Sequence, residues 1–217
     1  MNGTTLKNNY KGLPLSITTK NHEGFNTNIL DRISDCLNCM IHKHCKVFFI
    51  PFGLTYPANS QYPNDNILLS RFIEALTLYC KRTRRSKRTG NLIGNYDPKY
   101  VWTKELSTTT GQYHYHILLL LDGNKIQNAH GISKQATQLW AGCLGIQDAR
   151  GLVHLPLPEY DYPYGGIMIT RNDPYFQQVY ATCFQIASYI AKVYSKGSAP
   201  LNSNEYGSSR LPASILS

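Results

Sequence analysis

The chain has 217 residues, of which 42% are hydrophobic, so its length fits one domain and its composition excludes wholesale disorder. No apolar run approaches the roughly 18–20 residues of a membrane span, and the polar N-terminus shows no signal-peptide pattern. We therefore expect a cytoplasmic protein with no membrane partner. The net charge is +9, from 22 basic and 13 acidic residues.

The first part of the chain predicts an arm, a helix, a strand and a second helix. Residues 1–27 are rich in Asn, Thr, Lys and Gly, which is typical of a flexible N-terminal arm. Apolar residues recur at helical spacing over 29–44, and the nearly all-apolar run 46–52 predicts a buried strand. After a loop rich in Pro and Asn, residues 67–85 carry a second helical pattern.

The basic residues are concentrated at the C-terminal end of that second helical pattern. Six of them lie within eight residues: Lys81, Arg82, Arg84, Arg85, Lys87 and Arg88. Without these six the chain is close to neutral, so we expect this segment to contact the phosphates of a nucleic acid. The other interpretation is a solubilising helix end, where cations also suit the helix dipole.

The middle of the chain predicts a β-hairpin. Its strands are expected at 100–106 and 113–121, joined by a turn that contains Gly111. The second strand is apolar on both faces beyond its start, which is typical of a strand in the centre of a sheet.

The remaining elements complete an α+β pattern. A helix, two short strands and a final helix are expected at 132–144, 151–155, 166–170 and 173–197. This order favours helices packed on a mostly antiparallel central sheet. We expect the domain to span 28–197 and to be followed by a mobile C-terminal tail over 198–217.

Six cysteines are present, and several of them lie close to histidines. The segment with Cys36, Cys39, His42 and Cys45 is one candidate zinc site, although it lacks a second well-spaced pair of ligands. Cys36 and Cys39 also fall at the helical spacing of core residues, and this pattern favours buried, reduced thiols.

A second candidate metal site lies in the predicted hairpin. His114 and His116 are two residues apart in a strand, so both imidazoles point to the same face. Glu105, on the preceding strand, lies opposite this pair if the hairpin register is even. Two imidazoles and one carboxylate with open positions suit Mg²⁺ or Mn²⁺ acting on a phosphate oxygen.

The predicted last helix offers a candidate nucleophile. Its apolar stripe includes Tyr194, which is therefore expected to be a core residue, whereas Tyr189 falls on the polar side with Lys192. Because the ordinary pKa of a phenol is about 10, a neighbouring ammonium would favour the phenolate. Lys192 could also stabilise phosphate charge. By itself, Tyr189 could equally be a half-exposed surface residue.

Together these motifs resemble a known group of enzymes. The stretches YVWTKE, YHYHILLLL and SYIAKVYSK begin at positions 100, 113 and 188. They resemble the HUH endonucleases, which include rolling-circle replication initiators, and more closely the inovirus-type initiators, also called YagK/YfjJ-type proteins, of phages and integrated elements. The resemblance covers roughly residues 40–197. It implies a ferredoxin-like HUH fold, metal ligation by His114, His116 and Glu105, and attack by Tyr189 assisted by Lys192.

The resemblance also implies a function. We expect site-specific nicking and joining of single-stranded or origin-hairpin DNA through a 5′-phosphotyrosine intermediate, which would start rolling-circle replication in the cytoplasm of a bacterial host. With no nucleotide-hydrolysing P-loop in the chain, a helicase and a polymerase would come from the host or the element. Trp102, Tyr113 or Tyr115 could stack on bases.

One stretch departs from the family pattern. The first strand of that family commonly runs into Arg-Phe-Asp-Leu, whereas this chain has Pro51-Phe52-Gly53-Leu54, without the Arg and the Asp. Two alternative functions therefore stay open. One is a catalytically silent DNA-binding regulator on the same fold, and the other is a zinc-binding interaction protein built on the cysteine segment.

Overall fold

The computed structural model describes residues 3–16, 24–63, 65–85, 90–107, 110–156, 161–193 and 204–212. Its centre is an antiparallel sheet in the strand order β10-β5-β9-β8-β12, with β11 also paired to β5. The bounds are β5 (Lys46–Leu54), β8 (Lys99–Leu106), β9 (Tyr113–Asp122), β10 (Val153–His154), β11 (Ile167–Thr170) and β12 (Tyr206–Ser208). The predicted α+β class with a mostly antiparallel sheet is confirmed, and β9 lies in its interior.

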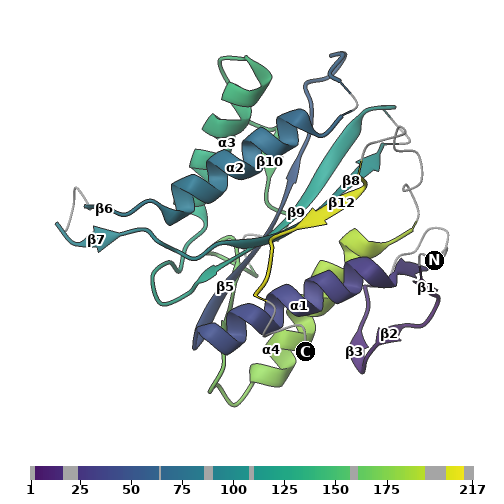
Figure 1. Ribbon diagram of the computed structural model, residues 1–217, viewed down its shortest axis with the longest axis vertical. Coiled ribbons are helices and arrows are strands. Elements are labelled where there is room, and N and C mark those ends of the chain that lie inside the picture. The colour runs from purple at the N-terminus through teal and green to yellow at the C-terminus, as the bar shows by residue number, and fades with distance from the viewer. Residues whose placement is uncertain are drawn as a thin grey trace.

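Helices cover both faces of this sheet (Figure 1). One face packs against α1 (Thr27–Lys43) and α4 (Phe176–Ser188), and the other against α2 (Ile67–Lys81) and α3 (His130–Leu144). Side chains alternate along β9, so that Leu118 and Leu120 enter the first core while Ile117 and Leu119 enter the second. Burial on both faces is the physical reason why β9 is apolar throughout most of its length.

The second helix is shorter than its pattern predicted. It ends at Lys81, because Arg82 has an extended backbone and Arg84–Arg85 form β6, which pairs with β7 (Leu92–Ile93). Directly after β7, Gly94 has a positive φ of 105° and lies so close to the Arg82 carbonyl oxygen that a Cβ there would clash with it. The basic residues were therefore wrongly placed on a helix end: part of the segment is a narrow hairpin that projects from the body (Figure 1). Lys87 and Arg88 lie outside the described residues.

The N-terminal residues, expected to be a flexible arm, are folded where the structure describes them. β1 (Thr4–Thr5) pairs with β4 (Phe25–Asn26), and β2 (Asn9–Tyr10) pairs with β3 (Leu13–Pro14). Leu15 is buried in the core beneath α4, and the Ser16 N–H donates to Ser188 Oγ at 2.8 Å. This contact with the core is the reason the described arm residues are held in place.

The described part of the expected tail lies against the sheet. Residues 204–212 follow the edge of the sheet, and β12 pairs with β8 through Gly207 opposite Trp102. The pairing satisfies backbone groups that an unpaired edge of β8 would leave open. Within the described residues, no helix is both long and apolar enough to cross a membrane.

The last helix ends earlier than expected. Instead of continuing to Gly197, α4 stops at Ser188 and tightens into a 3₁₀ turn, η1 (Tyr189–Ala191). Lys192 then adopts an extended backbone and forms a β-bridge with Phe25. Tyr194, predicted as a core residue of this helix, lies outside the described residues.

Candidate metal centre and tyrosine

The register of the β8–β9 hairpin brings the three predicted metal ligands to one face of the sheet. Glu105 pairs directly with His114, and Thr103 pairs with His116. The Glu105 carboxylate oxygen Oε2 lies 3.7 Å from His114 Nε2 and 3.4 Å from His116 Nε2. One ligand atom from each of the three residues lies within 4.8 Å of the others, so this group could hold a metal ion.

Burial prepares these groups for a cation. The Glu105 side chain is only 1% exposed, whereas those of His114 and His116 are 25% and 21% exposed. Burial, and then the neighbouring His116, lower the pKa of His114 to about 4, although Glu105 acts in the opposite direction. His114 is therefore neutral at pH 7, as a metal ligand must be.

One buried nitrogen also indicates that the site accepts a ligand. His116 Nε2 is buried and has no hydrogen-bond partner in the described part of the protein. Buried polar atoms without partners are rare, because leaving one unpaired costs free energy. A cation at the point where this nitrogen meets Glu105 would satisfy it, so the donor set fits a divalent metal.

Tyr189 and Lys192 lie beside this group. The Tyr189 ring is 42% exposed and its centroid is 5.5 Å from that of His116. The ammonium nitrogen of Lys192 is 3.7 Å from the centre of the Tyr189 ring and 3.3 Å from Glu105 Oε2. The structure thus brings together all five residues that the sequence assigned to metal and nucleophile.

The local backbone explains how Lys192 reaches the carboxylate. Beyond the 3₁₀ turn, its extended backbone at φ −54° and ψ 139° leads the chain into the bridge with Phe25. Lys192 is therefore not a neighbour of Tyr189 on a continuous helix face, as the sequence pattern predicted. It is a separate extended residue whose side chain, 13% exposed, joins the tyrosine to Glu105.

His154 is a site residue that the sequence pattern did not reveal. In the sheet, His154 pairs with Gly53, and Gly53 pairs with His116, so all three lie in one row. A Cβ at Gly53 would lie only 2.6 Å from His154 Nε2. The imidazole therefore occupies the space that a side chain at position 53 would fill. The missing Asp of the family pattern at Gly53 was the available signal.

A groove connects these histidines with the surface. It has a volume of about 990 Å³ and is lined by His114, His116 and His154. Residues of the loops before α2 and between β8 and β9, including Gln112, also line it, together with Tyr113 at the start of β9. Partial desolvation, and then the nearby His116, lower the pKa of His154, so this imidazole of the groove is neutral at pH 7.

Two other predicted groups do not join this site. Lys81, which begins the basic segment, lies in the same surface groove as Lys99, at the opposite end of β8 from Glu105. At the usual rise per residue, six residues of strand separate these ends by roughly 20 Å. Of the aromatic candidates, Tyr115 is fully buried and contacts the Tyr56 hydroxyl, so it cannot stack on a base.

The cysteine segment forms no metal group in the described residues. Cys36 and Cys39 are buried residues of α1, whereas Cys45 is exposed and its thiol donates to Asn124 Oδ1. Burial raises the pKa of the Cys36 thiol to about 12, which disfavours the thiolate that zinc requires. Among the residues described, Glu105, His114 and His116 form the one cluster of three or more potential ligands.

Comparison with known proteins assigns the chain to a family. A family model described as the YagK/YfjJ C-terminal domain matches residues 7–209. No curated protein and no solved structure matches the chain. The family match includes the β8–β9 hairpin, Tyr189, Lys192 and the edge strand β12. Because it covers nearly the whole sequence, the chain belongs to the YagK/YfjJ C-terminal domain family.

Proposed function

We propose that this protein is a metal-dependent endonuclease of the HUH class, which nicks and rejoins single-stranded DNA through Tyr189. The observation that carries the proposal is the chain of contacts from Tyr189 through Lys192 to Glu105, beside two histidines that face the same carboxylate. A nucleophile, a cation and a metal-binding group within contact distance of one another are the parts that phosphodiester transfer requires.

The chemistry follows from the positions of these side chains. The Tyr189 hydroxyl oxygen attacks the scissile phosphorus and gives up its proton, and the bond from phosphorus to the 3′ oxygen breaks. That oxygen takes up a proton and leaves as a 3′-hydroxyl, while the phosphate stays on the tyrosine as a 5′-phosphotyrosine. Attack by a new 3′-hydroxyl reverses the step and rejoins the strand.

Lys192 and a metal ion would each stabilise negative charge in the reaction. A Mg²⁺ or Mn²⁺ ion held by Glu105, His114 and His116 would polarise a phosphate oxygen. Lys192 is positioned over the Tyr189 ring, where its charge would stabilise the phosphate that the tyrosine attacks. Because its ammonium contacts the same Glu105 oxygen that faces both histidines, Lys192 and a metal ion compete for that carboxylate.

The biological role that fits this chemistry is initiation of rolling-circle replication. The free 3′-hydroxyl can prime a polymerase, and the covalent bond preserves the energy needed to close the circle. The substrate would be single-stranded or origin-hairpin DNA of a phage, plasmid or integrated element in a bacterial cell, and a helicase and polymerase would act with the protein.

A catalytically silent DNA-binding regulator is the second candidate. The observation that favours it is the first strand, in which Pro51 and Gly53 replace the Arg and Asp of the family pattern. If those groups are needed for turnover, the fold and its basic hairpin could persist as a binding module. The endonuclease should form a covalent adduct with DNA, whereas the silent regulator should not.

The test is a denaturing-gel assay for a covalent protein–DNA adduct. Labelled oligonucleotides from the origin of the encoding element are incubated with the protein and Mn²⁺ or Mg²⁺. We expect a metal-dependent adduct that is absent in Tyr189→Phe and His114→Ala. Tyr175→Phe is the matched control, because Tyr175 is an exposed tyrosine before α4 and outside the site. Salt-sensitive binding without any adduct, on every origin strand, would establish the silent regulator instead.

A further inference from the structure

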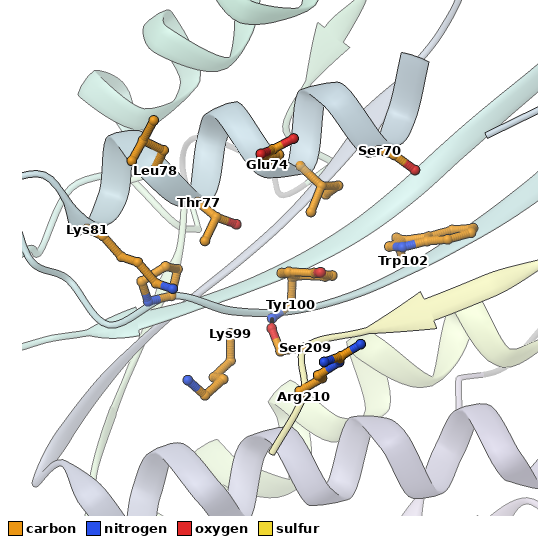
Figure 2. A pocket seen from close by; sticks show the side chains of 12 residues that line it. Ser70, Glu74, Thr77, Leu78, Lys81, Lys99, Tyr100, Trp102, Ser209 and Arg210 are labelled. Atoms are coloured by element: carbon orange, nitrogen blue, oxygen red, sulfur yellow. Dashed lines mark hydrogen bonds between the residues drawn. The ribbon is translucent and has the colours of Figure 1, made fainter. Parts of the chain in front are cut away.

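A second groove lies on the opposite face of β8 from the metal centre. Glu105 and Thr103 point to the metal face, whereas Tyr100 and Trp102 point toward α2 and the second core. Between them and α2 is a groove of about 580 Å³ (Figure 2). It is closed on its other side by Ser209 and Arg210, which follow β12.

The floor of this groove is aromatic and held in place. Figure 2 shows the rings of Tyr100 and Trp102 lying along β8, beneath the side chains of α2. A Cβ at Gly207 would lie 2.8 Å from the Trp102 indole, so glycine on β12 leaves room for that ring to lie across the strand. Tyr115 supports the indole from within the core in an edge-to-face contact, with ring centroids 6.3 Å apart.

The rim of the groove is basic. Lys81 at the end of α2, Lys99 on β8 and Arg210 after β12 line it, against one acidic residue, Glu74. The ammonium of Lys99 is 3.5 Å from Asp97, whereas Lys81 and Arg210 form no salt bridge with the described residues. Lys81 also leads into Arg82 and the basic β6–β7 hairpin, which extends the positive surface away from the groove.

We propose that this groove binds a segment of single-stranded DNA, with one base on the Trp102 indole and its flanking phosphates on Lys81 and Arg210. Flat aromatic rings beneath a basic rim are the usual means of binding single strands without sequence preference, because every base has a π-face. An acidic peptide would use the cations but not the rings, and an apolar partner would leave the cations unpaired. The proposal rests on the proposed function, since it gives the same substrate strand a second contact away from the nicking site.

The two tryptophans allow a direct test. Trp140 is fully buried and its indole N–H donates to the Thr55 carbonyl, so quenching of fluorescence by added bases reports on Trp102. A twelve-residue oligothymidylate is titrated into metal-free Tyr189→Phe protein, in which no cleavage can occur. We expect quenching that saturates, and that is lost in the additional variant Trp102→Phe. Titration with thymidine monophosphate at the same nucleotide concentration should give much less quenching, because it lacks the neighbouring phosphates.

Affinity gives an independent measure. With a labelled oligothymidylate, Trp102→Leu should weaken binding about tenfold, the effect expected for loss of one stacked base. Lys81→Gln with Arg210→Gln should weaken binding and reduce the slope of log affinity against log salt by about 1 to 2. Tyr164→Leu, at an exposed tyrosine outside this groove, is the matched control.

The outcomes separate this proposal from the nuclease itself. Normal adduct formation by wild type, with no quenching and no loss of affinity in Trp102→Leu, would overturn the groove and leave the nuclease in place. Quenching without any adduct would support the groove as the surface of a silent DNA-binding protein. Equal quenching by the mononucleotide would overturn the strand assignment in favour of a free-nucleotide pocket.

Discussion

At the scale of single residues, the candidate site depends on one shared carboxylate. Glu105 is buried and contacts Lys192 and both histidines, so its charge is matched by an ammonium when no metal is bound. Removing the ammonium leaves a buried carboxylate without this neighbouring cation, and such a group has a strong tendency to bind a metal ion.

Lys192→Met should therefore separate metal binding from catalysis. We expect Mn²⁺ to bind at least about tenfold more tightly, because the competing ammonium is gone. Adduct formation should nevertheless fall by about a hundredfold or more, since the reacting phosphate loses its nearby cation. Calorimetric titration with Mn²⁺ and the adduct assay measure the two effects. Lys125→Met, which breaks the Lys125–Asp122 pair outside the site, should change neither, and weaker Mn²⁺ binding in Lys192→Met would contradict the competition.

Gly53 and His154 should act as one unit. Adding a single methyl group in Gly53→Ala places a carbon 2.6 Å from the His154 ring, which must then move away from its position beside His116. We expect Gly53→Ala and His154→Ala each to lower the rate of adduct formation about tenfold, because the groove loses an imidazole that would face the bound DNA. The double variant should be no worse than either single variant. Additive losses would show that Gly53 matters for another reason.

At the scale of elements, two helices end earlier than their sequence patterns predicted, and each early end places charged residues that the proposed function uses. The early end of α4 releases Lys192 toward Glu105, and the early end of α2 places the basic residues on a hairpin. The edge strand β12 contributes a third feature, because Gly207 gives the Trp102 indole its space. All three are ends or edges, where local periodicity is weakest as a guide.

The basic hairpin gives a prediction at this scale. Arg82 and Arg85 are exposed, and the Arg85 guanidinium donates to the Gly90 carbonyl within the same hairpin, so both side chains can contact phosphates. Arg82→Gln with Arg85→Gln should weaken oligonucleotide binding and lower the salt slope by about 1 to 2, with little change in folding. Lys134→Gln with Arg150→Gln removes the same charge from other exposed positions and should leave the slope unchanged. If both double variants lower the salt slope equally, the hairpin would contribute only through the net charge of the protein.

At the scale of the whole molecule, Asp97 joins segments that are distant in sequence. Its carboxylate contacts Lys43 at 2.6 Å and His44 at 2.9 Å, both at the end of α1, and Lys99 at the start of β8. Burial alone would raise the pKa of Asp97, but the hydrogen bonds from Lys43 and His44 outweigh it and hold the pKa well below its usual range. The folded protein therefore favours the ionised carboxylate more strongly than the unfolded chain does.

Asp97→Asn should remove this stabilisation while keeping the backbone. Asp97 has a positive φ of 49°, a conformation that Asn also tolerates. We expect the free energy of unfolding at pH 7 to fall by about 2 kcal/mol, as for loss of charged hydrogen bonds. The stabilisation is complete above pH about 4, the ordinary pKa of Asp, and is lost as the pH falls below it. Urea unfolding of wild type and Asp97→Asn from pH 7 to pH 3 measures the difference in their free energies of unfolding. If that difference disappears near pH 6, a group other than Asp97 is responsible for it.

The sequence by itself determined which side chains share a face. Strand periodicity placed His114 and His116 together, and it placed Glu105 opposite this pair on condition of an even hairpin register, which the structure shows. The same alternation identified β9 as a strand buried on both faces. These features depend on neighbours in the chain, and steric and hydrogen-bonding rules act strongly over such short distances.

Only the tertiary structure decided which faces meet. His154 lies beside His116 because β10 pairs with β5, and Lys192 reaches Glu105 because its segment bridges to Phe25. The described parts of the expected arm and tail form a packed segment and an edge strand for the same reason. Pairing between distant segments depends on the free energy of the whole fold, in which many small contacts compete with chain entropy, and no local pattern records that balance.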